Sequence, residues 1–240
     1  MKRTFVASIA VLCVVVASGS ALAQYDGGAS VWIGLGPPAV LGDLNNRMLM
    51  GTTSAARGAL SPNAAALQRS TVPTQLQRYE QTGADQVIRQ LAATYPPEHR
   101  QQAASAFREL RTGFQKIERQ FDLPRGDVAG AVAAFLAGSY MAYRNVDFPD
   151  ANFKPLVAQM RQIVGSNPAF AEATAAQRQD AFDQLSMLGM LMATTQMALA
   201  QQANPRVEAA LRSTAKGYLE QFLKTDADRV QITAQGLVLR

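Results

Sequence analysis

The sequence predicts an all-α fold, a single multi-helix bundle around one buried central helix, with a short extended strap at the C-terminus. Three observations predict it. Residues 127–144 are apolar on every side, and a helix without a polar face has to be enclosed by other helices or lie in lipid. Amphipathic segments flank this stretch along the chain. Pro-Pro and Asn-Pro pairs separate those segments, as expected where one helix ends and the next begins.

The central helix carries a small residue at every fourth position. Along a helix of about 27 Å, these residues would form a groove in which the backbone of another helix can approach closely. They are Gly130, Ala134, Gly138 and Ala142. Asp127 suits the first turn and Arg144 the last, because both complement the helix dipole. Residues 185–199 are nearly as apolar, so we expect these two helices to pack together.

The other elements follow from the spacing of their apolar residues. A helical pattern begins at Thr74, with a break at Thr82–Gly83, and ends at Pro96–Pro97. Residues 98–121 form the clearest amphipathic helix, with apolar side chains at spacings of four and three. The tail, residues 229–239, alternates weakly and predicts the extended strap. Further helices are predicted over residues 153–164, 168–202 (straight or bent) and 205–224.

Four methionines lie in the apolar half of the predicted helix over residues 168–202. They fit either an adaptable core filling or a copper site on a flexible ligand surface. Because no histidine or cysteine lies near them, we interpret them as core. The four are Met187, Met190, Met192 and Met197.

The N-terminus has the pattern of an export signal. Two basic residues precede an apolar run over residues 5–17, and residues 18–23 end in the small-x-small pattern that signal peptidase reads. We therefore predict a signal peptide over residues 1–23 and a periplasmic or secreted protein. The alternative is an N-terminal membrane anchor, but the apolar run is shorter than the roughly 20 residues that a spanning helix needs.

Removal of this signal changes the charge and the thiol content. It takes Lys2 and Arg3 and no acidic residue, so the formal charge falls from +5 to +3. The remaining basic residues are scattered and lack interleaved aromatics, which argues against a nucleic-acid surface. The only cysteine, Cys13, lies inside the signal. The mature chain therefore excludes disulfides, thiol catalysis and cysteine-bound metal.

Residues 24–73 are rich in Gly, Ala, Asn, Ser and Pro and predict a poorly ordered N-terminal arm. Its one apolar segment, residues 30–36, contains Trp32. We interpret this segment as docked on the core rather than as a recognition peptide, because an exposed apolar cluster would promote aggregation. Residues 74–240 show no repeat and no compositional break, so they predict one helical domain.

Three stretches resemble an uncharacterised family of exported bacterial proteins, known as a domain of unknown function. They are Asp127–Ala142, Thr174–Leu185 and Ile232–Leu237. The chain differs from family members that carry tryptophan in the central helix, where it has Phe135, Tyr140 and Tyr143 instead. The resemblance implies an exported helical domain and supplies no active-site residues.

Few residues suit catalysis. His99, the only histidine, is predicted on the polar side of the helix over residues 98–121, which excludes a histidine-pair metal motif. Asp180 and Asp183 share one helix face. They fit either an acid and base for glycoside cleavage or solvent-facing charges beside Arg178. We favour solvent-facing charges and expect both carboxylates to be exposed.

Tyr140, Tyr143 and Arg144 are the candidate ligand-binding residues. They lie close together at the end of the central helix and fit a small anion or sugar site. The alternative, which we favour, is a surface-reaching arginine with two tyrosines at the core edge. We predict no catalytic residue, no metal ligand and no cofactor.

These observations favour a non-enzymatic binding or assembly role in the cell envelope, with an envelope protein or polymer as the partner. The alternative is an envelope hydrolase that uses acidic residues. A third interpretation inserts the two apolar helices into the membrane as a hairpin. Their glycines, threonines and tyrosines argue against it, so no stable membrane span is expected after signal removal.

Overall fold

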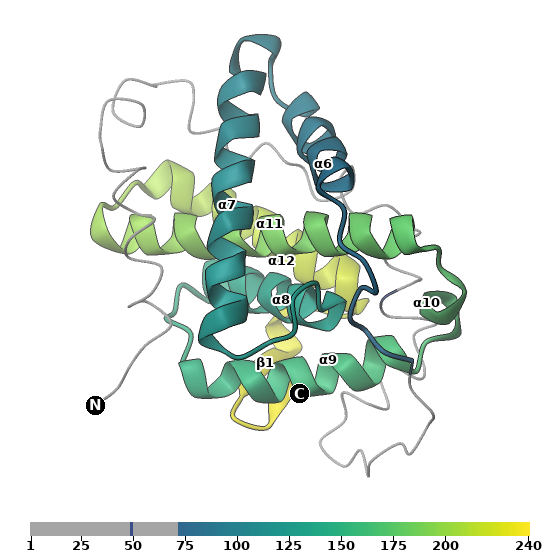
Figure 1. The fold of residues 1–240 in the computed structure, drawn as a ribbon. Helices are drawn as coiled ribbons and strands as arrows, with labels where there is room; N and C mark the ends of the chain where they lie inside the picture. Colours follow the sequence, from purple (N-terminus) through teal and green to yellow (C-terminus); the bar gives the residue numbers. More distant parts are fainter. Residues whose placement is uncertain (1–48, 50–71) are drawn as a thin grey trace.

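The computed structural model describes residue 49 and residues 72–240, and over these residues it confirms the predicted all-α bundle with a buried central helix (Figure 1). The signal peptide and the Trp32 segment lie outside the described residues. The elements are α6 (Gln81–Ala93), η1 (Pro97–His99), α7 (Arg100–Gln120), α8 (Val128–Arg144), η2 (Asp150–Asn152), α9 (Phe153–Gly165), α10 (Pro168–Glu172), α11 (Ala175–Gln201), α12 (Pro205–Leu223), η3 (Ala227–Arg229), β1 (Val230–Thr233) and β2 (Gly236–Leu239).

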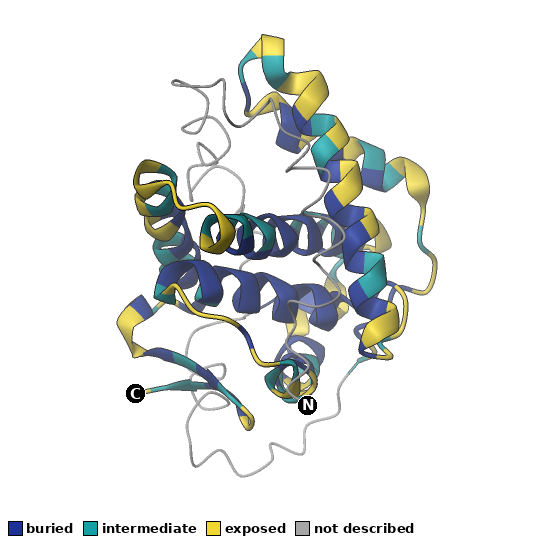
Figure 2. Cartoon of the chain, turned by 90° about the vertical axis from the view of Figure 1, so that its left-hand side faces the viewer, coloured by how far each residue is buried: buried dark blue, intermediate teal, exposed yellow. Residues whose placement is uncertain are grey.

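Helix α8 is the central helix. Asp127 caps its N-terminus by accepting the backbone N–H of Ala129, as a capping carboxylate does. Every residue of α8 except Tyr140 and Arg144 is buried. Helices α11, α9 and α12 pack around it, and α11 and α9 run on opposite sides of it in Figure 1. Figure 2 shows α8 buried along its length.

The predicted close approach of a second helix to α8 is confirmed, and the second helix is α11. A Cβ placed on Gly138 would overlap the backbone oxygen of Gly189, and a Cβ placed on Gly189 would lie 2.6 Å from the backbone of Ala134. The two backbones therefore touch where both helices lack bulk. Gly130 does not take part in the contact with α11, because a Cβ there would meet the side chain of Leu123 at 3.1 Å.

Residues 74–80 are not helical, so the predicted helix start at Thr74 is wrong. The backbone of this segment pairs with the chain just before α8: Leu76 N–H donates to Gly126, and Thr74 accepts from Val128, at 3.0 Å each. These bonds occupy backbone N–H and C=O groups that would bond within the helix if residues 74–80 were helical. Helix α6 starts at Gln81 and runs through the predicted break.

The long helix predicted over residues 168–202 is two helices. Thr174 starts α11 with a capping box, in which its side chain and that of Gln177 each accept a backbone N–H of the other residue. Such a box fixes a new helix start, and α10 therefore ends before it. The four methionines are buried in the hydrophobic core, as predicted.

The C-terminal strap is an antiparallel hairpin of β1 and β2, with Ile232 opposite Leu237. The Gln159 side chain of α9 accepts the N–H of Leu237 at 2.7 Å and donates to its C=O at 2.8 Å. The hairpin is thus fixed to α9.

Two further facts bear on the predicted organisation. Leu49, inside the predicted arm, is fully buried and belongs to the hydrophobic core. Among the helices of the described residues, none combines the length and the hydropathy that a membrane crossing requires.

Candidate functional site

Three carboxylates are buried in the described part of the chain: Glu118, Asp127 and Asp183. Burying a charge is costly unless hydrogen bonds or an opposite charge compensate it. Each of the three has such partners, and the partners come from other segments.

Asp183 on α11 is fully buried, so the prediction that it faces solvent is wrong. Tyr79 donates its hydroxyl to Oδ1 at 2.6 Å, and Gln179 donates to Oδ2 at 3.4 Å. Arg111 Nε on α7 lies 3.9 Å from Oδ1. The segment before α6 and helix α7 therefore cover this turn of α11. Asp180, one turn away, is partly exposed.

Burial raises the pKa of Asp183 to about 6, although the Tyr79 hydroxyl and the Arg111 charge favour its ionised form. Burial, followed by the charge of Asp183 and the hydrogen bond to it, raises the pKa of Tyr79. Burial also raises the pKa of Asp180. Asp183 is thus a carboxyl group that titrates near neutral pH inside the protein.

Polar side chains fix the same segment at two more points. The Gln179 amide accepts the backbone N–H of Glu80 at 3.0 Å and donates to its C=O. Arg111 Nη2 donates to the side chain of Gln81 at 2.7 Å. The start of α6 is therefore held on both α11 and α7.

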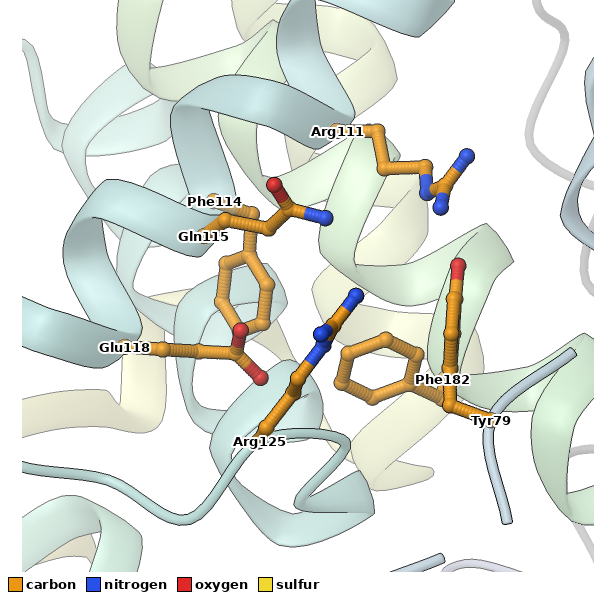
Figure 3. A pocket seen from close by; sticks show the side chains of 7 residues that line it. All are labelled: Tyr79, Arg111, Phe114, Gln115, Glu118, Arg125 and Phe182. Carbon is orange, nitrogen blue, oxygen red and sulfur yellow. The ribbon is translucent and has the colours of Figure 1, made fainter. Parts of the chain in front are cut away.

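A small hollow opens beside this cluster (Figure 3). The empty space among its lining residues, open solvent included, is about 220 Å³, and its enclosed part holds about one water molecule. Arg111, Gln115 and Arg125 turn their nitrogen atoms toward the same space in Figure 3. The hollow is lined by Tyr79, Arg111, Phe114, Gln115, Glu118, Arg125 and Phe182.

Glu118 supplies the carboxylate of this lining. It accepts the backbone N–H of Gly126 at 2.8 Å, and burial raises its pKa, while that hydrogen bond and the charge of Arg125 act in the opposite direction. The guanidinium carbons of Arg111 and Arg125 lie 5.2 and 5.6 Å from the ring centroid of Tyr79, a cation–π distance.

Asp127 forms a separate cluster at the start of α8. Its Oδ1 accepts the Thr74 hydroxyl at 2.6 Å, and its Oδ2 accepts Arg161 Nε from α9 at 2.8 Å. Since the same residue caps α8, it joins three segments at one carboxylate.

The sequence-predicted ligand residues are placed at the opposite end of α8. Tyr143 donates its hydroxyl to Asp228 Oδ1 at 2.7 Å, and Arg144 Nη2 donates to the Asp228 backbone oxygen at 2.6 Å. The hydrogen bond to Asp228 raises the pKa of Tyr143. Tyr140 is partly buried against the hydrophobic core. The structure thus brings Tyr143 and Arg144 together at Asp228, in contact with the C-terminal segment.

His99 ends η1 and precedes the first residue of α7, where it is partly buried. His99 was predicted on the polar side of this helix, but it lies before the first helical residue. The described residues include no group of three histidine, cysteine or acidic side chains arranged to hold a metal ion.

The sequence matches the family of unknown function DUF6683 over residues 38–240. The chain belongs to this family. The predicted resemblance to a domain-of-unknown-function family is thereby confirmed. The family match begins inside the predicted arm, which also contains the buried Leu49. Neither the curated proteins nor the solved structures that were compared gave a match.

In this DUF6683 member, sequence reasoning missed the residues around the hollow. Arg111 and Glu118 each directly follow an apolar residue of α7, but so does the exposed Arg108, so this pattern does not single them out. No local pattern marks Tyr79 and Arg125, which lie in connecting segments.

Proposed function

We propose that this chain is exported and acts in the cell envelope as a non-enzymatic domain that binds, or assembles with, an envelope protein or polymer. Export is supported by the signal pattern of residues 1–23. The binding role is supported by the hydrogen bonds of the buried acidic residues, which hold segments of the chain together.

That observation concerns Glu118, Asp127 and Asp183. Each accepts a hydrogen bond from another segment of the chain, at 2.8, 2.6 and 2.6 Å respectively. Acid–base hydrolysis needs a carboxyl group within hydrogen-bond reach of the substrate. These carboxylates are instead engaged in holding segments together, and the adjoining hollow presents hydrogen-bond donors to the surface.

An envelope hydrolase is the alternative, and one observation favours it. Burial raises the pKa of Asp183 to about 6, a value that suits a general acid near neutral pH. A substrate would first have to displace the Tyr79 hydroxyl, which donates to Asp183 at 2.6 Å. This cost makes the binding role the better-supported proposal.

The two proposals are separated by a capture experiment run beside an activity screen. Immobilised protein is incubated with envelope extract and with purified envelope polymers, and the same polymers are assayed for released fragments. We expect retention of a protein or polymer without fragments, both for the natural chain and for an Asp180→Asn, Asp183→Asn double variant. Fragment release that disappears in the double variant would replace the binding proposal with the hydrolase.

Export is tested on its own. Mass spectrometry of the protein recovered from outside the cytoplasm should find Gln24 as the first residue, because cleavage is predicted after Ala23. A chain that keeps residues 5–17 would support the membrane-anchor alternative.

A further inference from the structure

We propose that the hollow beside Tyr79 binds an oxyanion group, a carboxylate or a phosphate, carried by the ligand of this domain. The inference rests on the proposed binding function and names the chemistry of its ligand. It is carried by three hydrogen-bond donors that converge on one space, two of them cationic.

The first donor, Arg111, has unused capacity. The residue is 8 % exposed, and its Nη2 donates to Gln81 at 2.7 Å. Its Nε is buried without a hydrogen-bond acceptor and lies 3.9 Å from Asp183 Oδ1, beyond hydrogen-bond distance. A buried donor without an acceptor is unfavourable. An oxyanion in the hollow would bring a further acceptor to the Nη groups of this guanidinium, while its Nε stays paired with Asp183.

The other two donors complete the arrangement. Arg125 is exposed, in the connection between α7 and α8, and Gln115 lies one turn after Arg111 on α7. Figure 3 shows both guanidinium groups and the Gln115 amide facing a common space. Two arginines and an amide offer the planar arrays of N–H groups that match carboxylate and phosphate oxygens.

The charges in and beside the lining are nearly balanced. Arg111 and Arg125 are its two cations, and Glu118 is its only acidic residue. Glu118 Oε1 already accepts the N–H of Gly126 at 2.8 Å. Just behind the lining, Asp183 pairs with Arg111 at 3.9 Å, so the site attracts an anion through its converging N–H groups rather than through a surplus of charge. Phe114 and Phe182 form an apolar part of the wall, and reduced access of water strengthens the attraction between charges.

The size of the hollow limits what enters it. Its enclosed part holds about one water molecule, so a ligand would place at most a small charged group there. The rest of the ligand would lie outside, over the exposed side chain of Arg125. The ligand is therefore the charged end or side group of a larger molecule, or a free inorganic ion.

The proposal is tested with acetate and inorganic phosphate as probes, titrated into the purified full chain at constant ionic strength and followed by calorimetry. A second arm uses a short peptide with a free C-terminal carboxylate and the same peptide amidated. The variants are Gln115→Glu, which places an acid among the donors, and Arg125→Gln, which removes one cation. The matched control is Arg108→Gln, an exposed arginine of α7 outside the lining.

We expect saturable binding of at least one probe, weakened at least tenfold by Gln115→Glu and by Arg125→Gln and unchanged by Arg108→Gln. Binding of the peptide acid but not its amide would identify a carboxylate-bearing ligand, and binding of phosphate alone would identify a phosphate. No saturable binding, or an equal loss in the control, would overturn the proposal. Melting temperatures of all variants check that they are folded.

Failure of the oxyanion site can be distinguished from failure of the proposed binding function. If envelope material is captured equally well by the natural chain and by Gln115→Glu, the binding function stands and the oxyanion site is wrong. If the chain proves to be a hydrolase, the titrations still report whether the hollow binds an anion.

Discussion

Helix α11 is packed in two different ways along its length. Its second half lies against α8, with Gly189 touching the backbone at Ala134 and Gly138. Its first half is covered by the segment before α6 and by α7, through the side chains of Tyr79 and Arg111 around Asp183. One contact depends on the absence of side chains and the other on hydrogen bonds in a buried place. The second half of α11 is therefore held by close backbone packing against α8, and we call it the shape half. The first half is held by buried hydrogen bonds and an ion pair, and we call it the charged half.

The largest expected effect tests the shape half. Gly138→Leu places a large side chain against the backbone of Gly189, and neither backbone can move away without separating α8 from α11. We expect a loss of unfolding free energy on the order of 3 kcal/mol or more, measured by chemical denaturation.

The matched control compares the stabilities of two alanine variants, Gly130→Ala and Gly138→Ala. The nearest atoms to a Cβ at Gly130 belong to side chains, Leu123 at 3.1 Å and Asp127 at 3.6 Å, so Gly130→Ala should cost less than about 1 kcal/mol. Equal stabilities of the two alanine variants would contradict the close α8–α11 contact.

A smaller effect is expected from removing a hydroxyl in the charged half. Tyr79→Phe deprives the buried Asp183 of its 2.6 Å hydrogen bond, at a cost of about 2 kcal/mol. Tyr143→Phe removes a bond of similar length, 2.7 Å, to Asp228, whose side chain is 64 % exposed. Water replaces that lost partner, so we expect a cost below about 1 kcal/mol. Thermal and urea unfolding of the two variants give the comparison.

If both tyrosine variants lose the same stability, burial does not distinguish the two sites, and the contrast drawn within α11 loses its support. Tyr143→Phe also bears on the sequence-predicted ligand residues. A near-neutral change in stability with a loss of ligand capture would return Tyr143 and Arg144 to consideration as a binding site.

The smallest effect is a dependence on pH. Because the pKa of Asp183 is raised to about 6 in the folded chain, the folded state binds a proton more readily than the unfolded state, where the carboxyl has its ordinary acidic pKa of about 3.9. The ionised group therefore destabilises the fold above pH 6. That cost is progressively relieved as the pH falls from about 6 toward 4.

When the pH is lowered from 7.5 to 5, we expect protonation of this residue to raise the free energy of unfolding by an amount on the order of 1 kcal/mol. Other carboxyls with raised pKa values, such as Glu118 and Asp180, act in the same direction. Urea unfolding of the natural chain and of Asp183→Asn over this range isolates the contribution of Asp183. Parallel curves for the two proteins would show that Asp183 does not titrate in this way.

The shape half could be predicted from the sequence, and the charged half could not. The apolar runs of α8 and α11 are local patterns, and their small residues mark a close contact whatever the partner. Asp183 gives no such sign, because its shortest hydrogen bond comes from Tyr79, which lies 104 positions away along the chain. Its spacing from Asp180 predicts a solvent-facing pair instead.

The same reasoning explains the error before α6. Leu76 and Tyr79 have helical spacing, but backbone pairing with Gly126 and Val128 holds residues 74–76 extended. A pairing between distant segments overrides a short periodic pattern. The candidate site lies at this junction, so the part of the fold hardest to predict is also where the hollow forms.

The side chain of Gln159 has a consequence for how this protein behaves at high concentration. Its primary amide meets both backbone groups of Leu237, as the N–H and C=O of one residue in a neighbouring antiparallel strand would. An open strand edge is a template on which another chain adds by hydrogen bonding, the first step of ordered aggregation. By imitating one residue of a third strand, Gln159 occupies this position on the open edge of β2 and leaves its backbone groups without free bonding capacity for another chain.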